Sequence, residues 1–218
     1  YVTACHGFRT EADAIKHVCR VLGIKIRFLD TVSADDLMDM QFPDNPELIE
    51  KMLGKGLYLL AGASKIGKSW LVLWMAHCIS LGMPVWEFKT RKSDVLYLSL
   101  EDTHQRIQRR LVDVCGGETG MLEISTDAEL LGSGLEEQLN NYLHDHPDTK
   151  LIIIDTLQRI RHMKADSYSY AGDYATLTAL KQIADRFDIT ILLVHHTRKQ
   201  DADDAVDKMC GTTGLIGC

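Results

Sequence analysis

The stretch "GASKIGKS", from Gly62 to Ser69, stands between two apolar runs, Leu57–Ala61 before it and Leu71–Ala76 after it. It matches the pattern GxxxxGK[ST] at every defined position. An ordinary strand–turn–helix connection could match this pattern by chance. An apolar strand before the turn and an apolar helix after it are, however, the context that the pattern requires. The stretch therefore predicts a loop that binds nucleotide phosphates.

The residue types of this loop suit a triphosphate. A glycine-rich turn lets backbone N–H groups converge where a Cβ would obstruct them. The helix that follows adds free N–H groups and the positive end of its dipole. Lys68 supplies a charge for the β- and γ-phosphates, and Ser69 supplies a hydroxyl to Mg²⁺. We therefore expect ATP and Mg²⁺ as cofactors.

The surrounding sequence alternates between apolar strands and helical patterns. The predicted strands are residues 57–61, 94–101, 121–125, 151–155 and 189–196, and the predicted helices are residues 68–81, 102–114, 134–146 and 174–187. The strand "LIIID" is apolar without alternation, as a parallel strand buried on both faces requires. Asp102 and Gln105 form a capping box that opens the second helix. The pattern predicts an α/β fold, a mainly parallel sheet with helices on both faces.

Composition narrows the class of protein. The 218 residues carry a net charge of -7, which repels nucleic acid on average but is compatible with a local basic channel. No run approaches the ~20 apolar residues of a membrane span. The six cysteines are scattered and form no CxxC pair, which is typical of reduced thiols. We expect a cytoplasmic protein with no membrane partner.

Two segments are expected along the chain. Residues 1–47 form a short N-terminal helical segment and linker, in which apolar residues between Ala14 and Leu22 share one helical face. Its acidic part, residues 30–46, contains two prolines and is interpreted as a connector that docks on a neighbouring surface. Residues 48–218 form the main domain. Because the strand pattern is unfinished at Cys218, we expect this domain to be truncated at its C-terminal end.

Two acidic side chains end predicted strands. Asp155 closes residues 151–155, and Glu101 closes residues 94–101. Ligands of open α/β sheets collect at the carboxyl ends of the strands. A carboxylate there can hold Mg²⁺, which we expect of Asp155, although it could merely cap the next turn. Glu101 is the candidate for orienting or deprotonating water; the alternative is a solvated residue beside a helix cap.

His195 and His196 end the last predicted strand. Adjacent side chains on a strand point to opposite sides, so one of the two can face the γ-phosphate while the other packs away. A zinc site is the rival interpretation, but no further ligand stands at a recognisable spacing. Arg198, two residues on, could reach a phosphate or lie on the surface.

The order "GASKIGKS", "YLSLED", "LIIID", "LLVHH" resembles the RecA-like P-loop ATPase core. Within that group the chain is similar to the RepA family of hexameric replicative helicases of plasmids and mobile elements. The segments Leu100–Leu111 and Val194–Lys199 and the late "GTTGLIG" carry this second likeness. It covers about residues 56–217 and leaves residues 1–45 out. The resemblance implies an ATPase and DNA helicase, a homo-oligomeric ring of six subunits, and single-stranded DNA as a partner.

The resemblance also implies roles for individual residues. Asp155 matches the Walker B acid, which holds the metal with Ser69, and Glu101 matches the catalytic glutamate. His195 and His196 match a histidine motif near the γ-phosphate, which acts in catalysis together with Glu101 and Lys68. The loop residues that would bind the nucleotide are Gly62, Ala63, Ser64, Lys65, Ile66, Gly67, Lys68 and Ser69, with Trp70 beside them.

Arg110 matches an arginine that approaches the adenine, with Arg106 and Arg109 as nearby rivals. The alternative for Arg110 is an exposed helix cation. The family's arginine finger comes from a neighbouring subunit, beyond the "GTT" segment, and has no matching position in this sequence.

Three functions share this core. The first is an ATP-driven motor on single-stranded DNA, and its DNA-facing loops would be Arg159–Tyr170 and Arg198–Cys210. The first loop has cations and tyrosines that suit stacking, but it could equally be an ordinary surface loop, while the second loop is acidic. The other two functions are a nucleotide-dependent regulatory switch and a recombinase-type filament ATPase. The acidic charge favours the switch, and the histidine motif favours the motor.

Overall fold

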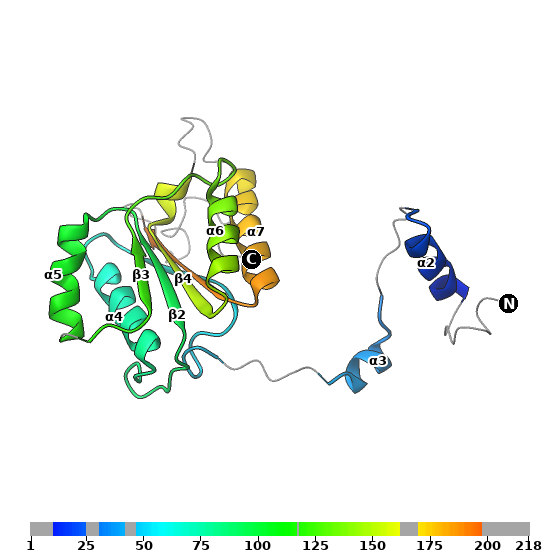
Figure 1. Ribbon diagram of the computed structural model, residues 1–218, viewed down its shortest axis with the longest axis horizontal. Coiled ribbons are helices and arrows are strands. Elements are labelled where there is room, and N and C mark those ends of the chain that lie inside the picture. The colour runs from blue at the N-terminus through cyan, green and yellow to red at the C-terminus, as the bar shows by residue number, and fades with distance from the viewer. Residues whose placement is uncertain (1–10, 25–30, 42–46, 117, 162–169, 198–218) are drawn as a thin grey trace, which may run out of the picture. The chain divides into compact units, whose positions relative to one another are not determined.

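The computed structural model describes residues 11–24, 31–41, 47–116, 118–161 and 170–197 (Figure 1). The chain divides into two compact units, Tyr1–Asp44 and Asn45–Cys218. The smaller unit holds helices α2 (Glu11–Val21) and α3 (Ala34–Asp39), and the larger unit holds every other described element. Among the described helices, none is both long and apolar enough to cross a membrane.

The smaller unit contains one helix that the sequence predicted and one that it did not. α2 confirms the predicted N-terminal helix; on its apolar face Ala14 is buried, whereas Val21 and Leu22 are exposed. α3 lies within the segment that was predicted to be a connector. It forms because the Ser33 hydroxyl accepts a hydrogen bond from the Asp36 backbone N–H at 3.0 Å, which caps its first turn.

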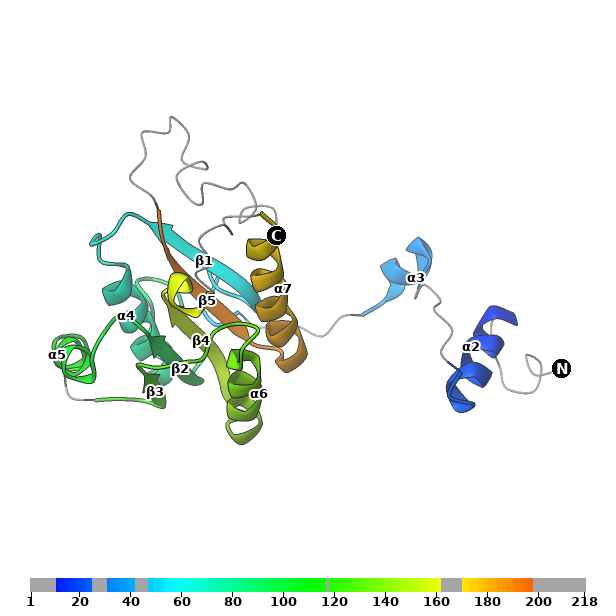
Figure 2. The ribbon, with the colours of Figure 1, turned by 90° about the horizontal axis from the view of Figure 1, so that it is seen from above.

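The larger unit is built on one parallel sheet. Its strands are β1 (Gly56–Gly62), β2 (Asp94–Ser99), β3 (Leu122–Ser125), β4 (Thr149–Asp155) and β5 (Thr190–His196). They lie in the order β1-β5-β4-β2-β3, and every neighbouring pair is parallel (Figure 2). All five predicted strands are present, so the predicted α/β fold is confirmed.

Helices cover both faces of the sheet (Figures 1 and 2). One face carries α4 (Lys68–Leu81), with α5 (His104–Cys115) packed on α4, and the other carries α6 (Leu135–Asp145) and α7 (Tyr170–Phe187). Successive residues of a strand therefore enter two different cores. In β4, for example, Ile152 and Ile154 belong to the core under α6 and α7, and Ile153 belongs to the core under α4.

The start of α5 differs from the prediction. Its N-cap is Thr103, whose hydroxyl accepts from the Arg106 backbone N–H at 3.3 Å, so the predicted capping box of Asp102 and Gln105 is wrong. Asp102 does not cap the helix because its carboxylate forms ion pairs with Arg106 and Arg110. The further strand expected near "GTTGLIG" lies outside the described residues.

A tight turn after α4 carries an aromatic pair. Val85 and Phe88 pair across the turn, and Trp86 between them has a positive φ of 52° and is half exposed. The ring of Trp86 packs on that of Trp74 in α4, with centroids 5.3 Å apart. Trp70 lies one turn before Trp74 on the same helix, so α4 and this turn together hold the three tryptophans of the chain.

Candidate active site

The sheet register brings four strand ends together. Gly62 at the end of β1 pairs with His196 of β5, and Asp155 of β4 pairs with Val194 of β5 and Ser99 of β2. Val194 lies in the core under α4, so His196, two residues on, emerges on the face that α4 covers. By the same alternation Asp155 follows Ile153 onto that face. The expected site therefore forms between the strand ends and the start of α4.

The loop before α4 has the backbone that a phosphate cradle needs. Gly67 is the N-cap of α4 with a φ of 97°, a conformation that a residue with a Cβ rarely adopts. No side chain of the described residues caps this helix, so none of their side-chain oxygens occupies the N–H groups of its first turn. Residues 63–67 are exposed. An anion can thus reach the helix N-terminus directly.

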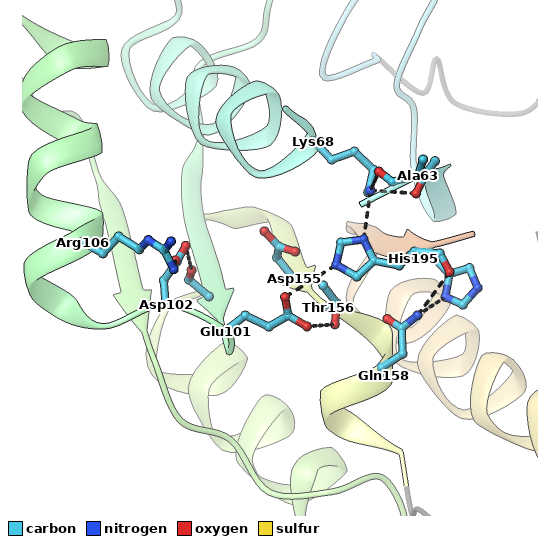
Figure 3. A network of polar contacts seen from close by, with 12 residues as sticks. Ala63, Lys68, Glu101, Asp102, Arg106, Asp155, Thr156, Gln158 and His195 are labelled. Carbon is cyan, nitrogen blue, oxygen red and sulfur yellow. Dashed lines mark hydrogen bonds and ion pairs between the residues drawn. The ribbon is translucent and has the colours of Figure 1, made fainter. Parts of the chain in front are cut away.

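Lys68 is buried at the start of α4. Its Nζ donates to the carbonyl oxygens of Gly62 at 2.8 Å and Ala63 at 2.7 Å, and it lies 3.0 Å from Nδ1 of His196 (Figure 3). Burial lowers the pKa of Lys68, while the carboxylates of Asp155 and Glu101 act to raise it. The ammonium is therefore held between the loop backbone and the end of β5.

Asp155 is buried behind Lys68. Its Oδ2 accepts a hydrogen bond from the Tyr97 hydroxyl at 2.9 Å, and its Oδ1 is buried without a hydrogen bond to any described residue. Burial raises the pKa of this carboxyl, against the opposing effect of the Ser69 and Tyr97 hydroxyls. A carboxylate oxygen without a partner, near a serine hydroxyl, fits a bound Mg²⁺.

Glu101 stands at the front of the site, just after β2. Its Oε1 accepts from the Thr156 hydroxyl at 3.1 Å, and its Oε2 lies 3.5 Å from Nε2 of His196 (Figure 3). Because Nδ1 of His196 faces the Lys68 ammonium, a neutral imidazole there carries its hydrogen on Nε2, toward Glu101. Lys68, His196, Glu101 and Thr156 thus form one continuous polar chain.

The two histidines are separated by the strand. His195 is buried, with Nδ1 3.0 Å from the Nε2 of Gln158, a residue of the short 3₁₀ helix η1 (Leu157–Ile160). His196 lies beside Lys68 and Glu101 on the other side of the strand. Among the described residues, no group of three His, Cys, Asp or Glu is placed to hold a metal ion, so the zinc interpretation gains no support.

Arg110 lies beside the loop rather than in solvent. Its side chain is 16% exposed, and its guanidinium carbon is 5.5 Å from the centroid of the Trp70 ring. Arg106 also pairs with Asp102, at 3.3 Å, but is largely exposed, and Arg109 is exposed. Of the three candidate arginines, Arg110 is the one in contact with a residue of the predicted nucleotide-binding set.

Comparison with known families agrees with this arrangement. The family model described as an AAA domain matches residues 25–202. The chain belongs to this family. The AAA domain is a P-loop ATPase, as predicted from its resemblance to the RecA-like core.

Two solved structures have a similar fold. A structure of an ATPase domain matches with a TM-score of 0.55 and 16% identity over 74% of this chain and 66% of that one. A DnaB-like replicative helicase, solved for its interactions with primase, matches with a TM-score of 0.54 and 13% identity over 88% of this chain and 55% of that one. The chain thus spans only part of the length of each. At these identities the likeness shows the fold alone. Among curated proteins, none matches the chain.

Several residues of the AAA domain's site were not anticipated from the sequence. They are Tyr97, which binds Asp155, Thr156, which binds Glu101, and Gln158, which binds His195. Strand alternation could have found Tyr97, since it lies two residues before Ser99 at the end of β2. Of the expected DNA-facing loops, residues 162–169 and 198–210 lie outside the described residues.

Proposed function

We propose that this AAA domain binds Mg-ATP, hydrolyses it, and uses the energy to move along single-stranded DNA in a RepA-like replicative helicase. The observation that carries the first part is the contact chain in which Lys68, His196 and Glu101 meet beside Asp155. These side chains come from α4, β4, β5 and the turn after β2, and no packing requirement explains why two carboxylates and a buried ammonium should converge there.

The binding step uses the loop and two side chains. The N–H groups of residues 62–69 and the Lys68 ammonium would hold the phosphates. Ser69 would hold Mg²⁺ together with Oδ1 of Asp155, which has no hydrogen bond to any described residue. Bound Mg²⁺ neutralises charge on the phosphate oxygens. Tyr97 occupies Oδ2, so it orients the Asp155 carboxylate for this role.

In the hydrolysis step, Glu101 would orient water and accept its proton. The Thr156 hydroxyl fixes one oxygen of Glu101, and His196 reaches the other. His196 also touches Lys68, so the group nearest the phosphates is connected to the group that activates water. If a γ-phosphate displaced the His196 imidazole, the surroundings of both the Lys68 ammonium and the Glu101 carboxylate would change.

The ATPase part is tested by nucleotide binding and turnover. ATP binding is measured by isothermal titration calorimetry, and phosphate release is measured with Mg²⁺ and after chelation. We expect Lys68→Ala to lose both, with its melting temperature close to that of the parent. Lys92→Ala, an exposed lysine outside the loop, is the matched control for charge. Parent-like turnover in Lys68→Ala would contradict the assignment.

The motor part is supported by the fold shared with a DnaB-like replicative helicase and by the histidine at the end of β5. As a motor of this kind, the protein is expected to assemble into a ring of six identical subunits. Its test is ATP turnover with and without single-stranded DNA over a range of salt concentrations, together with sedimentation in the presence of ATP. Stimulated turnover supports a motor. Absence of DNA binding at every salt concentration leaves the regulatory switch, which the net charge of -7 favours.

A further inference from the structure

We propose that Asp102 is a positioning residue that fixes Arg110 against Trp70 and thereby builds the surface on which the nucleobase stacks. This proposal rests on the proposed function, because it assigns the base end of the same nucleotide site. It concerns a carboxylate next to Glu101 in the sequence that takes no part in the polar chain described above.

Asp102 is unusually well held for a residue in a connection. Its side chain is 6% exposed, and both of its oxygens are engaged. Oδ1 pairs with Arg106 at 3.3 Å, while Oδ2 pairs with Arg110 and lies 3.4 Å from the Ser99 hydroxyl. A buried carboxylate with this set of donors is costly to disturb, because removing it leaves the Arg110 charge without its partner.

The ion pair determines what Arg110 can do. Asp102 takes the NH1 edge of the guanidinium and compensates its charge, which disfavours a role as a phosphate ligand. The guanidinium plane remains available for stacking, and its carbon Cζ lies over the Trp70 ring, 5.5 Å from the ring centroid. Arginine planes and indole rings are both surfaces on which a heteroaromatic base stacks.

The position of this pair suits a base rather than another ligand. Trp70 directly follows Ser69, and the residue is 42% exposed. A nucleotide whose phosphates lie in the loop would therefore have its nucleoside within reach of Trp70 and Arg110. The two adjacent carboxylates therefore have different roles. Glu101 lies where the γ-phosphate would react, and Asp102 holds Arg110 in place where the base would stack.

The test compares two ligands that differ only in having a nucleoside. ATP and inorganic tripolyphosphate, each with Mg²⁺, are titrated by calorimetry into the parent, Asp102→Asn and Arg110→Gln. We expect both substitutions to weaken ATP binding about tenfold, equivalent to ~1.4 kcal/mol, and to leave tripolyphosphate binding within about twofold. In the double variant the two losses should not add, because they act through one contact.

The matched control is Asp113→Asn, which makes the same change at an exposed site of α5, the helix that carries Arg110. It should bind both ligands as the parent does. At saturating ATP, the kcat of Asp102→Asn should stay close to that of the parent while its KM rises. If Asp102→Asn does not fold, Arg110→Gln and Arg110→Lys carry the comparison alone.

Two outcomes overturn the proposal. Equal weakening of ATP and tripolyphosphate means that Asp102 only braces α5, and unchanged ATP binding means that the base lies elsewhere. Failure of the proposed function gives a different result, in which the parent itself binds neither ligand, and the assignment of Asp102 then falls with it.

Discussion

The two faces of the sheet bury different kinds of side chain. The layer of α6 and α7 packs leucines and isoleucines against the strands, among them Leu139 and Leu180. The layer of α4 has an apolar core too, but α4 itself also buries Lys68, His77 and Ser80. One layer therefore serves stability, and the other combines stability with the site.

The difference arises at a single position of each strand. Along the middle of β4 and β5 the residues toward α4 are apolar, and the last residue on that face is polar, Asp155 in β4 and His196 in β5. On the opposite face His195 takes the last place in β5 and bonds to Gln158. The chemistry is thus added at the ends of otherwise ordinary buried strands, and the two layers should respond differently to substitution.

The largest effect is expected on the α4 side, at Glu101. Glu101→Gln keeps the side-chain shape and removes the base, so kcat should fall about 10²–10⁴-fold while ATP still binds. Single-turnover phosphate release and calorimetry measure the two properties separately. Glu118→Gln, an exposed residue away from the site, serves as the control. Undiminished turnover in Glu101→Gln would sink the assignment.

The opposite face should show the reverse pattern. Leu139→Ala removes a fully buried side chain under α6 and should lower the free energy of unfolding by about 2–5 kcal/mol. Its turnover per folded molecule should match that of the parent. Urea denaturation measures the first quantity, and Glu137→Ala on the exposed side of α6 is the control. A large loss of kcat in folded Leu139→Ala would erase the contrast between the layers.

The charge of Asp155 should lower the stability of the folded protein although the candidate metal site requires it. Burial raises the pKa of this carboxyl above its usual 3.8, so the folded protein holds the proton to higher pH than the unfolded chain does. The charged form therefore costs stability, and this cost is absent at low pH and grows as pH rises through the raised value.

Asp155→Asn removes that cost and the candidate metal ligand together. Without nucleotide and Mg²⁺, its melting temperature should exceed that of the parent near pH 7, by about 2–4 °C for each kcal/mol gained, and the gain should shrink toward pH 4. Turnover should be lost. A gain that is independent of pH would show that the buried charge is not its source.

The smallest effect concerns the start of α5. Thr103→Ala deletes the N-cap oxygen and should destabilise the domain by about 1 kcal/mol, whereas Thr103→Ser should retain the cap. Thermal melts of the two variants make the comparison. Equal stability of the alanine and serine variants would mean that the cap contributes nothing.

The sequence was sufficient to predict most helices and strands, but not which side chains contact one another in the site. Strands such as residues 151–155 were predictable because burial on both faces leaves a continuous apolar run, and the loop before α4 was predictable because its pattern is local. Local signals were also present where the prediction erred: Ser33 with Asp36 marks the start of α3, and Thr103 competes with Asp102 one residue away.

The contacts of the site could not be predicted in the same way. Tyr97 and Asp155 are 58 residues apart in sequence, and Lys68 and His196 are 128 apart. Their meeting depends on the order of the strands and on which face each strand end presents. Strand order follows from the whole packing of the sheet, which no single segment encodes.

The grouping of all three tryptophans in the layer of α4 gives the protein a built-in optical probe. Trp74 and Trp86 touch each other, and Trp70 adjoins the phosphate loop, whereas the layer of α6 and α7 has none. Indole emission therefore reports on one side of the sheet only. A fluorescence titration would follow events next to Ser69 without any attached dye, and unfolding confined to the far layer would leave the signal almost unchanged.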